Sequence, residues 1–176
     1  KIHAGILNDR SNKKHKREMK KNKFYNIDLI IVNFYPFQNM ANSNRSFNKI
    51  IENIDIGGPT MVRAAAKNFK DVLIISDAKD YFNLKKELDK NNGCSSLEFR
   101  KRMASKAFGL TAYYDSIISN WFYNKLDINF PDTKTIYGKK IQKLRYGENP
   151  HQNASIYLSK DNFNFKKIRG KELSYN

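Results

Sequence analysis

Three stretches of this 176-residue chain combine residue types that suit the binding and conversion of a polar, anionic ligand. The first reads Val-Asn-Phe-Tyr-Pro-Phe over residues 32–37, at the end of the apolar run that follows Asp28. Open α/β sheets bind ligands at the carboxyl ends of their strands, so this place favours a functional role for Asn33 and Tyr35. The alternative stays open that Tyr35 and Phe37 only cover the end of the sheet while Pro36 shapes the turn.

The second stretch covers residues 54–68 and reads Ile-Asp-Ile-Gly-Gly-Pro-Thr-Met-Val-Arg-Ala-Ala-Ala-Lys-Asn. Gly57 and Gly58 let a ligand approach the backbone, and the free N–H groups at a helix start favour an oxygen-rich or anionic group. The alternative is an ordinary turn before a helix, with Lys67 interacting favourably with the helix dipole.

The third stretch, residues 144–152, reads Leu-Arg-Tyr-Gly-Glu-Asn-Pro-His-Gln and contains almost no apolar residue. Arg145 offers a fork of donors that suits a phosphate, and Tyr146 offers a flat face for a heterocycle. A surface loop held by its own side chains is the alternative.

These stretches need a scaffold, and the apolar pattern predicts one. Residues 28–33 and 71–76 are continuous apolar runs between polar residues, which is typical of parallel strands buried on both faces. Helical spacing lies between them, around residues 47–54 and 61–68, and follows them over residues 81–88. This alternation predicts a doubly wound parallel α/β sheet.

The last third of the chain changes character. From Ser96 to about Lys125 the apolar spacing predicts one long helix, or two helices broken near Gly109. Residues 129–133 are typical of a linker, and beyond them short strand signals such as residues 154–158 alternate with turns. We therefore expect a domain boundary near residue 130.

Composition limits the classes of protein. Lys and Arg exceed Asp and Glu by 33 − 17 = +16, and residues 13–23 hold a basic cluster. Lys and Asn are abundant throughout and no zinc-finger or ribonucleoprotein motif accompanies the charge, so we expect no nucleic-acid partner, with a basic α/β nucleic-acid-binding domain as the alternative. Cys94 is the single cysteine, which excludes an internal disulfide and favours the cytoplasm. No apolar run approaches the roughly 20 residues of a membrane helix, so we expect no membrane partner.

The three motifs, together with residues 1–7 and 170–176, resemble the bifunctional purine biosynthesis family that joins a formyltransferase to IMP cyclohydrolase. The formyltransferase of that family acts on 5-aminoimidazole-4-carboxamide ribonucleotide (AICAR). The resemblance implies a methylglyoxal-synthase-like α/β domain over residues 1–130, lacking its N-terminal part. It implies the linker and the opening segment of the formyltransferase domain over residues 131–176.

The resemblance also implies roles for individual residues. Tyr35, Asp55 and Lys67 match catalytic positions of the cyclohydrolase. The positions that match substrate contacts are Val32, Asn33, Ile56 and Gly57 in the cyclohydrolase and Arg145 and Tyr146 in the formyltransferase. Phe69 departs from the family, which usually has His there, and this change is expected to alter packing beside Lys67.

The implied function is the last two steps of purine biosynthesis. A formyl group passes from 10-formyltetrahydrofolate to AICAR, and formyl-AICAR then cyclises to IMP with loss of water. The cyclisation needs no metal or redox cofactor, and the resemblance implies a homodimer. Because family residues that precede Lys1 and follow Asn176 are not in this sequence, we expect residues 1–176 alone to be inactive.

Geometry tests the catalytic assignment. One helix from Gly57 to Lys67 would separate its ends by about 15 Å at a rise of roughly 1.5 Å per residue. That distance is long for two groups acting on one purine. Either the helix starts later, near Thr60, with residues 55–59 folded back, or another subunit or loop completes the site. A methylglyoxal-synthase-type lyase would share the fold but leaves residues 144–152 unexplained.

Overall fold

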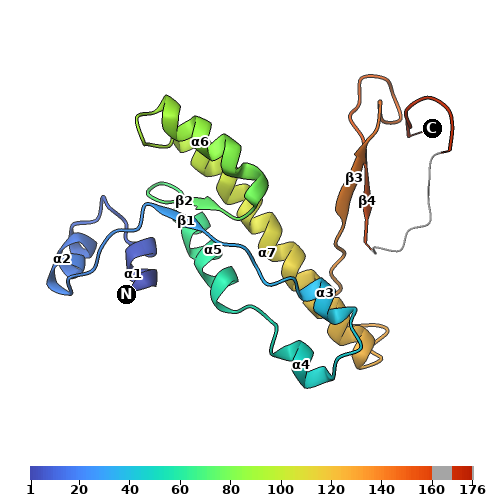
Figure 1. Ribbon diagram of the computed structural model, residues 1–176, viewed down its shortest axis with the longest axis horizontal. Coiled ribbons are helices and arrows are strands. Elements are labelled where there is room, and N and C mark those ends of the chain that lie inside the picture. The colour runs from blue at the N-terminus through green and yellow to red at the C-terminus, as the bar shows by residue number, and fades with distance from the viewer. Residues whose placement is uncertain (160–167, 176) are drawn as a thin grey trace. The chain divides into compact units, whose positions relative to one another are not determined.

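The computed structural model describes residues 1–159 and 168–175, coloured in Figure 1. The chain forms two compact units, Lys1–Asp115 and Ser116–Asn176, called here the first and second unit. The division falls inside a helix. The domain boundary near residue 130 stays a prediction.

The first unit is built on a parallel pair of strands. β1 (Leu29–Ile31) pairs with β2 (Leu73–Ile75), with Leu29 opposite Leu73 and Ile31 opposite Ile75. The connection between the strands contains the helices α3 (Phe37–Ala41), α4 (Phe47–Ile51) and α5 (Gly57–Lys67). The α/β class with a parallel sheet is confirmed, and both predicted strands are present in shorter form.

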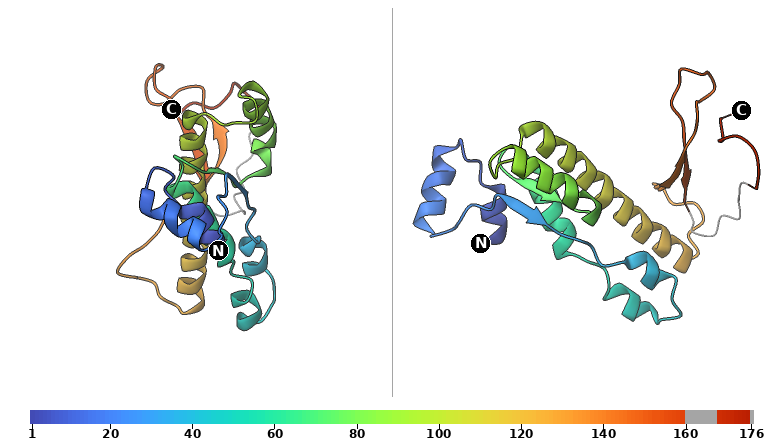
Figure 2. Two further views of the ribbon diagram at one scale, coloured as in Figure 1. Left: turned by 90° about the vertical axis from the view of Figure 1, so that its left-hand side faces the viewer. Right: turned by 45° about the horizontal axis from the view of Figure 1, so that its top comes forward.

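Two longer helices follow β2. A 3₁₀ helix (Ala78–Asp80) leads into α6 (Tyr81–Lys90), and α7 (Leu97–Lys125) then runs without interruption. The alternative of two helices broken near Gly109 is wrong. Figure 2 shows α5, α6 and the first part of α7 gathered around the strands.

The core lies between the sheet and these helices. Ala64, Ala65 and Ala66 are buried, and their small side chains let the backbone of α5 approach the strands closely. The remaining members of this buried cluster are Ile6, Ile30, Val62, Val72, Leu73, Ile74, Ile75, Leu84, Phe99, Met103, Ala104 and Ala107.

The two strands differ in burial. Every residue of β2 is buried, as predicted. The prediction of burial on both faces is wrong for β1, where Ile30 is 8% exposed but Leu29 and Ile31 are 36% and 47% exposed. Both strands are edges of this two-stranded sheet, so the difference comes from packing: β2 is covered on both faces, whereas the face of β1 that carries Leu29 and Ile31 is left open.

The N-terminal segment is fastened to the amino ends of both strands. It contains α1 (Ile2–Leu7) and α2 (Lys13–Lys21). Arg10 forms an ion pair with Asp28 at 2.6 Å, and its backbone N–H donates to Asp71 Oδ2 at 3.0 Å. Asp28 precedes β1 and Asp71 precedes β2, so one residue links the starts of the two strands.

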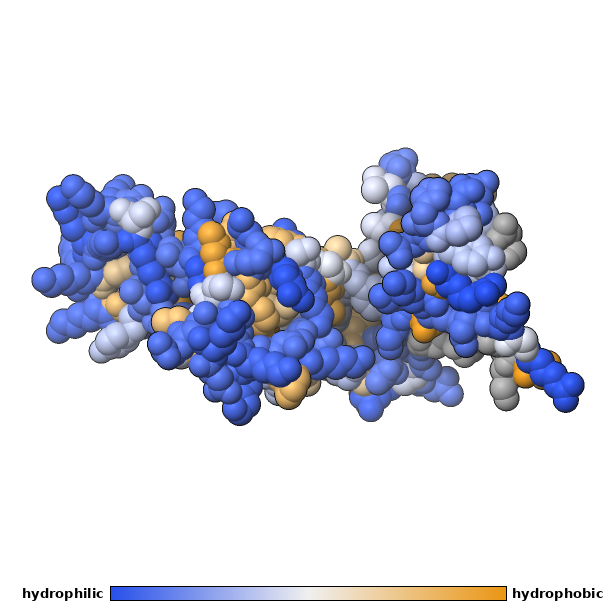
Figure 3. Space-filling view, turned by 90° about the horizontal axis from the view of Figure 1, so that it is seen from above, coloured by the Kyte–Doolittle hydropathy of each residue, from blue (hydrophilic) through white to orange (hydrophobic). Residues whose placement is uncertain are grey.

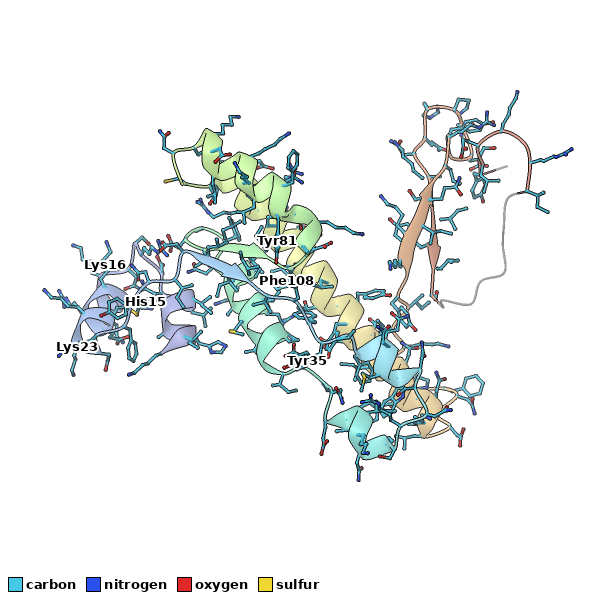
Figure 4. All side chains as sticks on the ribbon, in the orientation of Figure 1. His15, Lys16, Lys23, Tyr35, Tyr81 and Phe108 are labelled. Atoms are coloured by element: carbon cyan, nitrogen blue, oxygen red, sulfur yellow. The ribbon has the colours of Figure 1, made fainter. Side chains whose placement is uncertain are left out.

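The basic cluster is a solvent-facing helix. In α2 only Met19 is buried, and Asn12 caps the helix by accepting hydrogen bonds from the N–H groups of Lys14 and His15. Figure 4 labels His15, Lys16 and Lys23 in this region, and the surface at this end of the first unit is mostly hydrophilic (Figure 3). The charge of α2 is therefore hydrated.

The second unit contains the end of α7 and an antiparallel hairpin. β3 (Lys139–Lys143) pairs with β4 (Ser155–Leu158), which confirms the strand expected over residues 154–158. Thr135 is tied to α7 because Asn120 Nδ2 donates to its carbonyl oxygen at 3.1 Å. Among all described residues, no helix combines the length and the apolar character that crossing a bilayer requires.

An ion-pair cluster joins α7 to the carboxyl end of β2. The Lys106 amine donates to Asp77 Oδ2 at 3.1 Å and to Asp80 Oδ2 at 2.5 Å. Burial lowers the pKa of Lys106, but the hydrogen bonds to Asp80 and Asp77 outweigh burial and raise that pKa overall. The Lys79 backbone N–H, followed by Lys106, lowers the pKa of Asp77.

We predict that Lys106→Met lowers the free energy of unfolding by about 1 kcal/mol near neutral pH, because it leaves the buried Asp80 carboxylate without its cation. The lowered pKa of Asp77 means that its stabilisation is present above the ordinary value of 3.8 and is lost as the pH falls through the lowered pKa. Urea unfolding of both proteins across the acid range measures this.

Lys85→Met is the matched control. Lys85 pairs with Asp89 one helical turn away, with both side chains largely exposed, so this variant should cost only about 0.3 kcal/mol. Equal losses for the two variants would contradict the prediction, as would a Lys106→Met effect that persists undiminished in strong acid.

Candidate functional site

The carboxylate of Asp55 organises the start of α5. Its Oδ1 accepts a hydrogen bond from the Gly58 N–H at 2.8 Å, and its Oδ2 accepts one from the Tyr35 N–H at 3.4 Å. The first N–H groups of a helix have no partner within the helix, so Asp55 satisfies one of them. The same side chain thereby connects the first and second sequence motifs.

Tyr114 of α7 supports the loop that contains Asp55. The Asp55 backbone N–H donates to Tyr114 Oη at 2.9 Å. The Tyr114 ring lies edge-on to Phe34 and Phe37, at centroid distances of 5.1 and 6.3 Å. Tyr114 is only 6% exposed, and burial raises the pKa of its hydroxyl, although the hydrogen bond from the Asp55 N–H acts in the opposite direction.

Tyr114 was not among the candidates from the sequence. It lies 59 residues from Asp55 along the chain, and the aromatic residues of α7 are spaced as a packing face requires. No local pattern signals its hydrogen bond.

The motif residues beside Asp55 are exposed. These residues, Asn33, Tyr35, Ile56 and Gly57, are called here the rim. Tyr35 is 65% exposed and Ile56 is 73% exposed, and Asn33 and Gly57 are exposed as well. Figure 4 labels Tyr35 on the segment that joins β1 to α3. The Tyr35 hydroxyl has no hydrogen-bond partner among the described residues, so it is available to a ligand.

Val32 directly precedes the rim in sequence and is placed differently from the rim residues. It is half-buried and extends the pairing of β1, because its N–H donates to the Ile75 carbonyl oxygen at 3.0 Å. The carboxyl end of β1 therefore leads directly into the rim, as the position of the first motif predicted.

Lys67 lies at the other end of α5. The helix begins at Gly57 and ends at Lys67, so the alternative that it starts near Thr60 is wrong. The reason is the Asp55 cap, which satisfies the Gly58 N–H and lets helical geometry begin earlier. Lys67 is therefore about 15 Å along the helix from Gly57. Its side chain is exposed and makes no ion pair with the described residues.

The turn after Lys67 is held on two sides. Asn68 Nδ2 donates to the carbonyl oxygens of Ile6 and Asn8, at 2.7 and 3.1 Å. Arg100 Nε donates to the Phe69 carbonyl oxygen at 2.8 Å, and the Phe69 ring packs against the core. The residue that departs from the family motif thus contributes to packing while Lys67 remains exposed.

The third motif lies in the second unit, next to residues 173–175. The Arg145 N–H donates to the Leu173 carbonyl oxygen at 2.8 Å, and the Tyr175 N–H donates to the Tyr146 carbonyl oxygen at 3.3 Å. The Arg145 guanidinium lies 5.2 Å from the centroid of the Tyr146 ring, and Arg145 is exposed. The backbone is fixed while the guanidinium is free to meet an anion. Asn176 lies outside the described residues.

The polar groups of the candidate site are of a few kinds. In the described ranges, no group of three or more His, Cys, Asp and Glu side chains is arranged to hold a metal ion. The polar groups at the rim are instead a hydroxyl, a carboxylate and backbone N–H groups, which transfer protons and bind oxygen atoms.

Two family models match the chain. The model of the AICARFT/IMPCHase bienzyme family matches residues 65–176, and the model of the MGS-like domain matches residues 1–60. Together they define an α/β domain of the MGS-like class followed by the start of a second domain. The chain belongs to the AICARFT/IMPCHase bienzyme family.

Individual relatives agree with this membership. The bifunctional purine biosynthesis proteins PurH of Bradyrhizobium diazoefficiens and Clostridium perfringens are each 48% identical to the chain, over 100% and 99% of it. The chain spans about a third of their length, 34% and 35% respectively. The crystal structure of ForH is 34% identical with a TM-score of 0.58, covering 68% of this chain and 62% of that one.

The Asp55 cap can be tested with two neighbouring glycines. A Cβ at Gly58 would lie 2.6 Å from Asp55 Oδ2, whereas a Cβ at Gly57 would meet nothing within 4 Å. We predict that Gly58→Ala displaces the carboxylate and lowers the free energy of unfolding by about 1 kcal/mol, the usual net value of lost hydrogen bonds. Urea unfolding measures this loss.

Gly57→Ala is the control for folding. It adds the same methyl group to the same helical turn in open space, so its free energy of unfolding should match or slightly exceed that of the parent protein. If both variants behaved alike, Asp55 would not be held as described.

Proposed function

We propose that the complete protein containing this chain transfers a formyl group from 10-formyltetrahydrofolate to AICAR and cyclises formyl-AICAR to IMP. Family membership supports both activities. The observation that carries the cyclohydrolase assignment is the junction of Tyr35, Asp55 and the start of α5 at the carboxyl end of β1. The family motifs meet there through hydrogen bonds, although they are 20 residues apart in sequence.

The chemistry of the cyclisation defines the role of each group. The carboxamide nitrogen attacks the formyl carbon, negative charge develops on the formyl oxygen, and water then leaves. The exposed hydroxyl of Tyr35 and the amine of Lys67 donate to that oxygen, and Asp55 accepts a proton from nitrogen or orients a lysine. The reaction itself uses no metal or redox cofactor.

The nucleotide contacts surround these groups. Val32 and Asn33, after the end of β1, and Ile56 and Gly57, at the start of α5, would contact the nucleotide from two sides. In the first turn of α5 Pro59 has no N–H and the Gly58 N–H is bonded to Asp55, so the Gly57 N–H and the positive end of the helix dipole are what this turn offers to an oxygen atom of the substrate.

The length of α5 supports a homodimer. Since the helix separates Lys67 from Asp55 and Tyr35, another subunit or loop has to complete a site that uses all three residues. A second subunit is the choice that also agrees with the resemblance. Its Lys67 would then serve the rim of the first subunit.

The formyltransferase half uses the second unit. Arg145 pairs with the phosphate of AICAR and Tyr146 lies against its heterocycle, with a folate-type formyl donor supplying the one-carbon group. AICAR, formyl-AICAR and IMP are the ligands of this proposal, in the cytoplasm. A basic nucleic-acid-binding domain explains the charge of α2 but not the three motifs. The inactivity of residues 1–176 alone stays a prediction.

Lys67→Ala in the complete protein is expected to lower IMP formation by at least about a hundredfold, because it removes a donor to the developing oxyanion. Formyl transfer to AICAR should be largely retained. Steady-state rates of the two half reactions, measured separately with AICAR and with supplied formyl-AICAR, test this.

Lys90→Ala is its matched control, since Lys90 is exposed and ends α6 as Lys67 ends α5. A lysine that only complements a helix dipole contributes at most about 1 kcal/mol to stability. The assignment of Lys67 fails if the two variants lose IMP formation equally, or if Lys67→Ala loses both half reactions by unfolding.

Arg145→Ala should have the opposite selectivity. The Michaelis constant for AICAR in formyl transfer is expected to rise at least about tenfold, since hydrogen bonds to charged groups contribute about 1.5–3 kcal/mol. Cyclisation of supplied formyl-AICAR should be nearly unchanged. Lys143→Ala, which removes an exposed cation from β3 of the same unit, controls for loss of charge. An unchanged Michaelis constant in Arg145→Ala would reject the contact.

A further inference from the structure

We propose that the Tyr114 hydroxyl is a positioning group for cyclisation, which acts by accepting the backbone N–H of Asp55 and so holding the Asp55 carboxylate at the rim. This inference rests on the proposed cyclohydrolase function. It concerns a residue of α7 that none of the three sequence motifs contains.

The contacts of Tyr114 reach both parts of the candidate site. Its hydroxyl meets Asp55 at 2.9 Å, directly before the start of α5. Its ring contacts Phe34 and Phe37, which flank Tyr35 on either side. One side chain from a rigid helix therefore sets the position of the two segments that carry Tyr35 and Asp55.

The hydroxyl, rather than the ring, distinguishes positioning from packing. A phenylalanine at this position would make the same edge-on contacts with Phe34 and Phe37, but it would leave the Asp55 N–H without its acceptor. Asp55 is half-buried, so its N–H has limited access to water as a substitute. The Asp55 loop would shift, and small displacements of reacting groups lower rates steeply.

Tyr113 provides a comparison within α7. Its hydroxyl donates to Gln38 Oε1 at 3.4 Å, on α3. Tyr113→Phe also removes one hydroxyl oxygen from α7, but it leaves the acceptor of the Asp55 N–H in place.

The test measures cyclisation of formyl-AICAR by the complete protein carrying Tyr114→Phe. We expect kcat to fall about tenfold while KM changes less than about twofold, since the loss affects orientation of reacting groups rather than binding. Tyr113→Phe should keep kcat within about twofold of the parent. Thermal midpoints and formyl transfer, measured on the same preparations, report whether the fold is retained.

A double-mutant cycle with Asp55→Asn identifies the route of the effect. If Tyr114 acts through Asp55, adding Tyr114→Phe to Asp55→Asn should lower kcat by less than about a further twofold. Multiplicative losses would overturn the proposal, and so would an unchanged kcat in Tyr114→Phe or a loss that accompanies unfolding. If Asp55→Asn itself retained full cyclisation, the proposed catalytic role of Asp55 would fail instead.

Discussion

The half-buried carboxylate of Asp55 is the constraint on which the candidate site depends. Its two oxygens accept N–H groups from Gly58 and Tyr35, and its own N–H reaches Tyr114. A helix start needs acceptors for its first N–H groups, so the contact with Gly58 also decides where α5 begins. Asp55 therefore links the segment after β1, the start of α5 and the middle of α7.

The rigidity of α5 has a consequence for assembly. Buried alanines seat the helix on the sheet, the Asp55 cap fixes its first turn, and Asn68 and Arg100 hold the turn after its last residue. A helix held at both ends and along its length cannot bend to bring Lys67 to Asp55. The proposed dimer is one answer to this stiffness, because a group from another subunit or loop has to complete the site.

The second unit uses backbone pairing for a similar purpose. Arg145 and Tyr146 follow β3, and their peptide groups bond to Leu173 and Tyr175. The Arg145 side chain is not needed for that pairing, so its guanidinium lies over the Tyr146 ring and faces solvent. The third motif, a polar stretch in sequence, thus has a backbone bonded to residues 173–175 and an exposed cation.

The sequence by itself determined the α/β class, the two parallel strands and the identity of the motif residues, because apolar spacing and motif identity are local properties of the chain, but it left open whether one helix or two follows Ser96. Tertiary structure decided the rest. The start of α5 depends on the Asp55 cap, and the exposure of Leu29 and Ile31 depends on which face the helices cover. The role of Tyr114 depends on a hydrogen bond across 59 residues, which packing of α7 against the site creates and no local pattern encodes.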